Sequence, residues 1–315
     1  MQDILKSNTP AFVFDTAALK KRVAQIKEIV GETVSLCYSM KANPFFVPAM
    51  ITCVDKLEVC SPGELTICKK LGVDASRIIY SGVNKEIPDI KEAYEYGVGT
   101  FTAESVRQAD LIQQVVETAA AGEKAEVILR LNSGSQFGMS KEDLLTILQC
   151  RESKYTSLNF TGIHYFVGTQ RKRAKRKIKE LQMLLELFEE IQNKYGLKLK
   201  KLEYGPGFAV PYFEDDDFED TLYPVKELKD TLKQVAQQVD LTIEMGRFFT
   251  AECGTYYTNV ADLKTVGNAH YCILDGGMNH LTYLGQMMGM KTPIIKRHKN
   301  TSKQDERPEK ILKVF

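Results

Sequence analysis

Short apolar runs alternate with amphipathic stretches along most of this chain. The runs are of strand length, and the stretches between them repeat apolar residues at helical spacing. Eight runs predict strands, at 35–40, 57–60, 77–82, 99–103, 126–132, 160–166, 201–205 and 241–246. Because strands that alternate with helices form a parallel sheet, the pattern predicts an α/β fold, a (β/α)8 barrel of the TIM type. A doubly wound open sheet would show the same alternation, but the count of eight favours the barrel.

The pattern also predicts two domains. The barrel is expected to span about residues 27–248, and residues 1–26 together with 249–315 are expected to form a second, β-rich domain. In that domain the run AFVFD should pair with strands from two later segments, TYYTNVADLKTVG (255–267) and YCILDGG (271–277). The two ends of the chain are therefore predicted to meet outside the barrel.

Charge and cysteine content exclude several classes of partner. The 42 Lys and Arg residues balance 41 Asp and Glu residues, so no global field draws the chain to nucleic acid or to a membrane surface. The run RKRAKRKIKE (171–180) leads into helical apolar spacing and is predicted to be the charged face of a helix. The seven cysteines are an odd number without a C-x-x-C pair, and no stretch has the pattern of a signal peptide or a membrane span. We therefore expect a cytoplasmic protein that acts on a small molecule.

Polar residues gather where the predicted strands end, which is where barrels of this type place their active sites. Lys41 follows the first strand, Glu58 lies in the second and Glu244 in the eighth. Later strand ends add Asn132, Gly168, Thr169, Gly205, Gly207, Gly246 and Arg247. No metal site is expected, because His280 lacks partners at ligand spacing.

Two of these strand ends predict a phosphate site. Gly205-Pro206-Gly207 and Gly246-Arg247 would bring backbone N–H groups and one guanidinium together, at the place where barrels commonly bind phosphate. Lys41 across the rim could form a Schiff base with a phosphorylated aldehyde. A lysine in a partly apolar wall would lose its proton easily, as an imine-forming amine must. The combination predicts pyridoxal 5'-phosphate (PLP) as cofactor.

The motifs of the whole chain resemble those of the alanine-racemase-like (fold type III) PLP enzymes, and among them the ornithine/diaminopimelate decarboxylase family. The matching stretches are FVFDTAALKKRV (12–23), YSMKANP (38–44), LEVCSPGEL (57–65), IIYSGVNKE (78–86), SQFGM (135–139), GIHYFVGTQ (162–170), LEYGPGF (202–208), EMGRFFTAECG (244–254) and ILDGGMNHL (273–281). The resemblance implies that Lys41 forms the Schiff base and that Glu244 faces the pyridine nitrogen. It also implies that cofactor contacts come from Glu58, Phe166, Gly168, Thr169, Gly205, Gly207, Gly246 and Arg247.

A carboxylate at the pyridine nitrogen favours a protonated ring, which is a strong electron sink for decarboxylation. Alanine racemases place an arginine at that nitrogen, so Glu244 favours decarboxylation over racemisation. Phe166 stands where ornithine and diaminopimelate decarboxylases have a histidine that stacks on the ring, and Phe166 cannot carry a proton. His164 lies two residues earlier and fits a core histidine as well as a catalytic residue. Aromatic motifs of this kind occur in relatives that act on carrier-bound or siderophore-pathway amino acids.

The resemblance also implies that the β-rich domain is C-terminally incomplete in the chain as given. Family members continue with a Cys-containing motif and a later tyrosine that reach the partner's active site in a homodimer. The leading hypothesis is PLP-dependent decarboxylation of an amino acid, either a diamino acid such as diaminopimelate, ornithine or lysine, or a carrier-bound one. Such an enzyme would serve lysine or polyamine biosynthesis. The alternatives are a catalytically impaired PLP-binding regulator and an amino-acid racemase.

Overall fold

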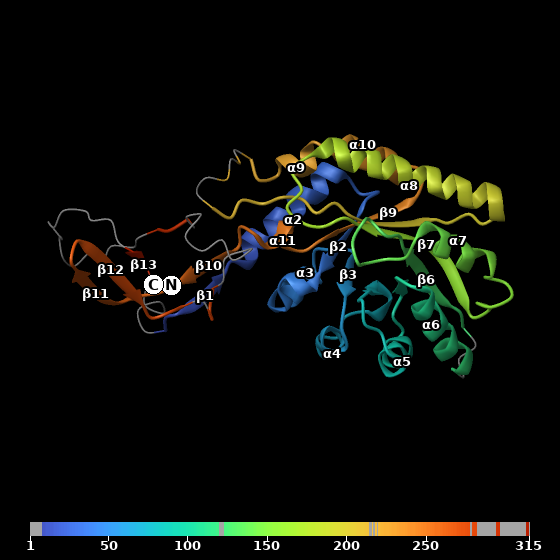
Figure 1. The fold of residues 1–315 in the computed structure, drawn as a ribbon, viewed down its shortest axis with the longest axis horizontal. Coiled ribbons are helices and arrows are strands. Elements are labelled where there is room, and N and C mark those ends of the chain that lie inside the picture. The colour runs from blue at the N-terminus through green and yellow to red at the C-terminus, as the bar shows by residue number, and fades with distance from the viewer. Residues whose placement is uncertain are drawn as a thin grey trace. The chain divides into compact units, whose positions relative to one another are not determined.

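The computed structural model describes residues 8–119, 123–213, 216, 218, 220–277, 279–281, 294–296 and 313–314. Contacts divide the chain into two compact units, and Figure 1 labels many of their elements. One unit comprises Thr16–Val210 and Asp220–Ala251, and the other comprises Met1–Asp15, Pro211–Glu219 and Glu252–Phe315. No helix in the described ranges is both long and apolar enough to cross a membrane.

The first unit is a closed parallel barrel, as predicted. Its strands run in sequence order around the barrel: β2 (Ser35–Ser39), β3 (Lys56–Val59), β4 (Ile78–Tyr80), β5 (Thr100–Ala103), β6 (Ala125–Arg130), β7 (Leu158–Phe166), β8 (Lys201–Gly205) and β9 (Asp240–Met245). β9 closes the barrel on β2, with Leu36 opposite Ile243 and Cys37 opposite Glu244. The eight-stranded prediction is therefore confirmed, and every predicted strand falls on an observed one.

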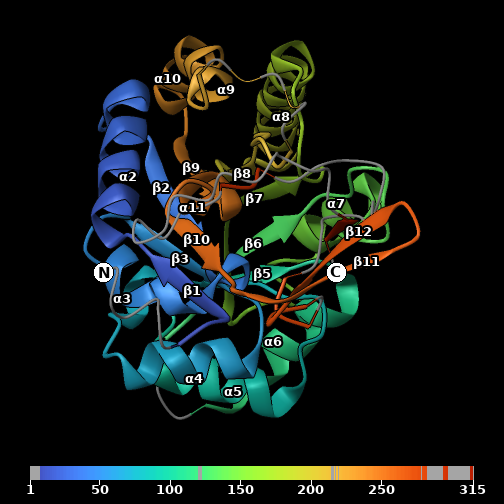
Figure 2. The same cartoon turned by 90° about the vertical axis from the view of Figure 1, so that its left-hand side faces the viewer.

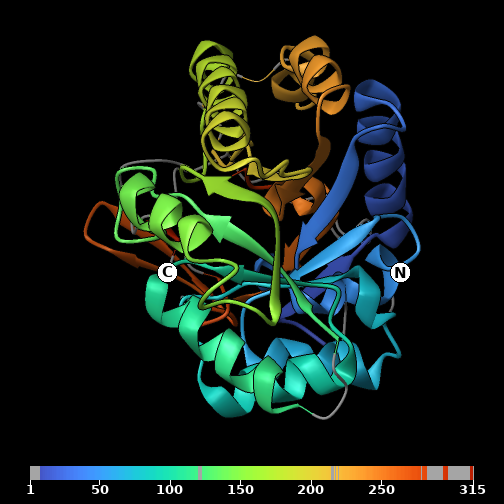
Figure 3. The same ribbon diagram turned by 90° about the vertical axis from the view of Figure 1, so that its right-hand side faces the viewer.

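Helices surround these strands, as Figures 2 and 3 show. They are α2 (Thr16–Val30), α3 (Val47–Met50), α4 (Pro62–Lys70), α5 (Ile87–Tyr96), α6 (Val106–Thr118), α7 (Lys141–Gln149), α8 (Ala174–Tyr195), α9 (Tyr223–Lys226), α10 (Lys229–Ala236) and α11 (Arg247–Thr250). Serine side chains start three of them: Ser61, Ser105 and Ser140 each accept a hydrogen bond from the backbone N–H three residues on. The basic run predicted to be a helix face opens α8.

Both faces of the barrel strands are buried, since helices cover the outside and side chains fill the inside. Cys37, Ile79 and Ile128 form one buried interior cluster and come from the alternate strands β2, β4 and β6. This is the layered packing expected of an eight-stranded barrel. The interior below the mouth is therefore a packed core.

The helix α2 belongs to the barrel unit, whereas the sequence analysis assigned residues up to 26 to the β-rich domain. The reason lies in Arg22, which is 3% exposed. Its Nε donates to the Phe248 carbonyl at 2.7 Å, and its Nη1 donates to Thr221 Oγ1 at 2.9 Å. Those contacts tie the helix to elements at the other end of the barrel sequence.

The second unit contains short antiparallel pairs. β1 (Ala11–Phe14) pairs with β10 (Gly254–Tyr257), as predicted for AFVFD. The predicted pairing of AFVFD with YCILDGG is wrong, because β12 (Ala269–Leu274) pairs instead with β11 (Val260–Val266) and with β13 (Lys313–Val314). A two-residue turn, with Gly267 at φ 59°, joins β11 to β12 and makes them neighbours.

Candidate active site

The chain turns sharply after β2 and presents Lys41 at the barrel mouth. The 3-10 helix Met40–Ala42 follows the strand directly, and Asn43 is extended in front of Pro44. The Tyr38 hydroxyl donates to the Asn43 carbonyl at 2.7 Å. The residues around Lys41 therefore fix a turn, which explains why a lysine at the end of an apolar run is followed by Ala-Asn-Pro.

The Lys41 amine lies among acidic and thiol groups of neighbouring strands. Its Nζ is 2.8 and 2.7 Å from the two carboxylate oxygens of Glu58 and 3.5 Å from Oε1 of Glu244. Cys60 Sγ is 3.6 Å away. The Glu58 and Glu244 side chains are 3% and 4% exposed, while that of Lys41 is 49% exposed. The amine thus reaches from the mouth down to two buried carboxylates.

These carboxylates decide the protonation state of Lys41. Burial acts to lower its pKa, but Glu58 and Glu244 raise it more strongly, so the pKa of Lys41 lies above its usual range. The expectation that Lys41 would lose its proton easily is therefore wrong for this arrangement. That expectation considered the apolar wall and not the two acids that the fold brings to the amine.

Glu244 is held in one orientation by two further residues. Ser39 Oγ donates to its Oε1 at 3.0 Å, and His164 Nε2 lies 2.9 Å from its Oε2. Burial acts to raise the pKa of Glu244, but the Lys41 ammonium and the His164 hydrogen bond outweigh it and hold the pKa well below the usual range. Glu244 is therefore an anion, and His164, which is 2% exposed on β7, is its direct partner.

Two more buried acids line this part of the barrel. Burial, and next the charge of Glu244, raise the pKa of Glu58. The same causes raise the pKa of Glu203, which is 2% exposed. Neither Glu203 carboxyl oxygen has a hydrogen-bond partner among the described residues. Sequence reasoning missed Glu203, although an acid that alternates with Leu202 and Tyr204 in a buried strand was a usable signal.

Each of the two predicted phosphate loops packs against the loop that follows a neighbouring strand. A side chain at Gly207, which has φ 58°, would collide with the Gly168 carbonyl, and one at Gly246 would press on Ala42 at 2.7 Å. Arg171 N donates to the Gly207 carbonyl at 2.9 Å. The loop after β7 therefore meets the loop after β8, and the loop after β2 meets the loop after β9. Only glycine fits at Gly207 and Gly246.

The remaining predicted residues lie around the same loops. Arg247 is the first residue of α11 and directly follows Gly246. Thr169 is exposed beside Gly168. The Phe166 ring occupies the space that a side chain at Gly205 would need. The backbone carbonyl of Phe166 accepts a hydrogen bond from Ser133 Oγ at 2.7 Å.

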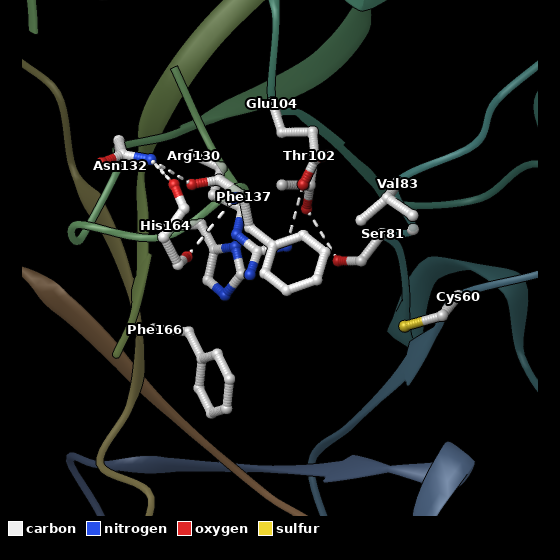
Figure 4. A network of polar contacts seen from close by, with 12 residues as sticks. Cys60, Ser81, Val83, Thr102, Glu104, Arg130, Asn132, Phe137, His164 and Phe166 are labelled. Carbon is white, nitrogen blue, oxygen red and sulfur yellow. Dashed lines mark hydrogen bonds and ion pairs between the residues drawn. The ribbon is translucent and has the colours of Figure 1, made fainter. Parts of the chain in front are cut away.

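The opposite sector of the mouth carries a second polar network, drawn in Figure 4 together with Cys60, His164 and Phe166. Ser81 Oγ and Thr102 Oγ1 lie 2.9 Å apart, and Arg130 Nη1 is 2.9 Å from Glu104 Oε2. The Arg130 guanidinium stacks over the Phe137 ring at 5.2 Å. Apart from Asn132, whose Nδ2 donates to the Phe137 carbonyl at 2.7 Å, sequence reasoning did not identify this network.

Lys85 also belongs to this sector, in the loop between β4 and α5. It is 3% exposed, and its Nζ donates to the Gly82 carbonyl at 2.6 Å and to Gln108 Oε1 at 3.3 Å. Burial lowers the pKa of Lys85 to about 8, and the nearby Glu104 raises it only in part. A lysine in the polar run SGVNKE gave no sign that it would be buried.

The donor set fits PLP. Lys41 supplies a primary amine at the mouth, Glu244 supplies a buried anion, and the loops at Gly207 and Gly246 leave no room for a side chain. An amine suits an aldehyde, an anion suits a pyridinium, and close glycine loops allow backbone N–H groups to approach a phosphate.

The family model for the pyridoxal-binding domain of pyridoxal-dependent decarboxylases matches residues 16–251. The chain belongs to this family. The predicted cofactor, PLP, and the predicted class, a decarboxylase, are thereby confirmed at the level of the family. The match begins and ends within a residue of the barrel unit.

Two relatives of this chain are named as decarboxylases, and one solved structure is similar to it. L-Glutamyl-[BtrI acyl-carrier protein] decarboxylase of Niallia circulans is 27% identical over 310 residues, which are 91% of this chain and 72% of that protein. Diaminopimelate decarboxylase of Aquifex aeolicus is 27% identical over 292 residues, 87% of this chain and 67% of that protein. The structure of SrLDC with PLP and cadaverine has a TM-score of 0.78 at 25% identity and covers 88% of this chain and 71% of its own.

Proposed function

We propose that this chain decarboxylates an amino acid with PLP held at Lys41. The observation that carries the proposal is the contact of the Lys41 amine with buried Glu58 and Glu244 in a barrel of this family. Bound there, PLP supplies an electron-poor ring that accepts the electron pair left when carbon dioxide departs.

Each residue of the site has a role in this proposal. Lys41 would hold the aldehyde carbon of the cofactor, and Glu244 would pair with its pyridine nitrogen. His164 acts through Glu244: its hydrogen bond at 2.9 Å fixes the carboxylate orientation and favours the anion. Phe166 would contact the cofactor ring. The residues that would surround the phosphate are Gly168, Thr169, Gly205, Gly207, Gly246 and Arg247.

Glu58 controls the proton of Lys41. Its carboxylate faces the ammonium with both oxygens, so the amine becomes reactive only when that proton leaves. Burial and Glu244 raise the pKa of Glu58, which makes Glu58 a suitable acceptor for the proton at the moment the amine is needed.

The substrate class remains an α-amino acid, free or carrier-bound. Relatives named for carrier-bound glutamate and for diaminopimelate match at the same identity, 27%. They therefore support a carrier-bound and a free amino acid equally. The odd number of cysteines, none of them in a C-x-x-C pair, supports a cytoplasmic location. We further propose a homodimer, which the mass of the particle in solution would test.

The test is carbon dioxide release from a panel of amino acids and carrier-bound glutamate, with purified protein and PLP. Lys41→Ala should lower the rate about 1,000-fold or more, the scale on which loss of a covalent nucleophile acts. Borohydride should attach the cofactor to the peptide that contains Lys41 in every protein that keeps Lys41, and not in Lys41→Ala. The exposed Lys69→Ala is the matched control. A Lys41→Ala protein that keeps its rate would refute the proposal.

A further inference from the structure

Cys60 is a fixed thiol beside the reactive amine. It follows β3 directly, and its Sγ is 3.6 Å from Lys41 Nζ and 3.1 Å from Glu58 Oε1. Its backbone is held as well, because Cys60 N donates to Glu64 Oε2 at 2.7 Å. Gly82 packs so closely on the Cys60 carbonyl that any side chain there would collide with it. The thiol therefore has a defined position in the site.

Decarboxylation needs a proton donor at this place. When carbon dioxide leaves, the electron pair of the broken C–C bond stays on the substrate α-carbon, which must take up a proton to become part of an amine. The α-carbon is bonded to the amino nitrogen, which takes the position of Lys41 Nζ. A group that touches Lys41 Nζ therefore lies close to the α-carbon as well.

The groups recorded in contact with Lys41 Nζ differ in what they can donate. Glu244 is an anion without a proton to give. Glu58 faces the Lys41 ammonium with both carboxylate oxygens and is the acceptor of its proton. Burial, and next the charge of Glu58, raise the pKa of Cys60, so that its thiol stays protonated at neutral pH. A protonated thiol in contact with both Lys41 and Glu58 is thus a proton store beside the α-carbon.

We propose that Cys60 is a further catalytic residue, which donates the proton to the α-carbon after carbon dioxide has left. The proposal rests on the decarboxylase function proposed above. The S–H bond breaks, a C–H bond forms with the electron pair of the lost C–C bond, and a thiolate remains. The ammonium of the released Lys41, which already contacts Sγ in this structure, then returns a proton to the thiolate and becomes the neutral amine.

The contact itself can be tested without activity. ortho-Phthalaldehyde joins an amine and an adjacent thiol into a fluorescent isoindole, so cofactor-free protein should become fluorescent. Lys41→Ala and Cys60→Ala should both abolish that signal. Cys53→Ala, which removes a half-buried thiol hydrogen-bonded to the Ala49 carbonyl, should leave it unchanged.

The proton transfer is tested by the ratio of amine to carbon dioxide, each measured separately with a substrate that the unsubstituted enzyme decarboxylates. A proton that reaches the cofactor instead of the α-carbon leaves the amino nitrogen on the cofactor, and water releases a carbonyl product. Cys60→Ala should form amine about 100-fold more slowly, as expected for loss of a general acid. It should also yield less amine per carbon dioxide, while Cys53→Ala keeps the original ratio.

The outcomes separate the two proposals. An unchanged ratio and rate in Cys60→Ala would show that Lys41 or another group supplies the proton, and would overturn the role of Cys60 alone. A lower rate with an unchanged ratio would likewise overturn proton donation and leave Cys60 as a packing residue. Absence of carbon dioxide from the unsubstituted enzyme with every substrate would overturn both proposals.

Discussion

Two lysines stand at the barrel mouth, and the less buried one holds its proton more firmly. Lys41, after β2, has a side chain 49% exposed and faces the carboxylates of Glu58 and Glu244. Lys85, after β4, is 3% exposed, and its hydrogen-bond partners in the described part of the chain are the neutral oxygens of Gly82 and Gln108. The pKa of Lys41 is raised, and that of Lys85 is lowered to about 8. Burial acts to lower both pKa values, and the two carboxylates reverse that effect only at Lys41.

The two lysines also differ in what their amines contact and in how accessible they are. Lys85 ties its loop to α6 through Gln108, whose Nε2 also donates to the Val83 carbonyl at 3.0 Å. Its amine is easily deprotonated but is enclosed by its own loop. Lys41 is accessible and, beside its two carboxylates, holds its proton firmly. A low pKa alone would therefore point to Lys85, whereas the lysine that we propose to be reactive is Lys41.

Lys85→Met should show the largest effect on stability. Burial lowers the pKa of Lys85 to about 8 in the folded chain, so the unfolded chain binds more protons above that pH. The loss of folding stability caused by burying the Lys85 amine is complete below pH 8. It disappears as the pH rises toward about 10.4, where the unfolded chain also releases the proton. The unfolding free energy of Lys85→Met relative to the original protein should fall by about 2 to 3 kcal/mol over that interval. Urea denaturation at several pH values measures it, and a pH-independent difference would contradict the comparison.

Glu203→Leu should come next, because Glu203 is an acid near Lys41 without a hydrogen-bond partner in the described structure. Burial raises its pKa, so the folded chain keeps a proton that the unfolded chain releases above about pH 4.5. The variant should gain about 2 kcal/mol at neutral pH. The gain should shrink as the pH falls below about 4.5, because both the folded and the unfolded chain then keep the proton. Thermal unfolding at pH 4 and pH 7 distinguishes this from a gain in packing, which would persist in acid.

Glu58→Gln tests the partner of Lys41 directly. Loss of one carboxylate should lower the pKa of Lys41, so that an amine-reactive reagent modifies cofactor-free protein about tenfold faster at pH 8, or one pKa unit. Peptide mass spectrometry reads the extent of modification at Lys41. Glu104→Gln, near Lys85, is the matched control. Equal modification rates in the unsubstituted protein, Glu58→Gln and Glu104→Gln would contradict the comparison of Lys41 with Lys85.

The smallest effect is expected from an exposed ion pair. Lys69 Nζ lies 2.8 Å from Glu92 Oε1, with the side chains 38% and 42% exposed. Water screens this pair, so Glu92→Gln should cost about 0 to 1 kcal/mol. A loss as large as that expected at Lys85 or Glu203 would mean that burial is not what separates the strong interactions from the weak ones.

Much of the fold was accessible from local patterns. The eight strands, the barrel and the glycines that now stand at loop contacts were predicted, because periodicity and turn chemistry depend on neighbours in sequence. The pairing of AFVFD with YCILDGG failed, because a two-residue turn gave β12 another neighbour. Lys85 was missed because a lysine in a polar run gives no sign of burial, whereas Glu203 was missed although its buried strand offered a signal.

The sequence alone determined that a lysine would stand at the end of a barrel strand among acids and glycines, since each motif is short and continuous. Only the tertiary structure decided which acids meet that lysine. Glu58 is 17 positions from Lys41 and Glu244 is 203 positions away, yet both contact its amine. The protonation state of Lys41 depends on those two charges together, and charges so far apart in the chain act on one amine only after the barrel has closed.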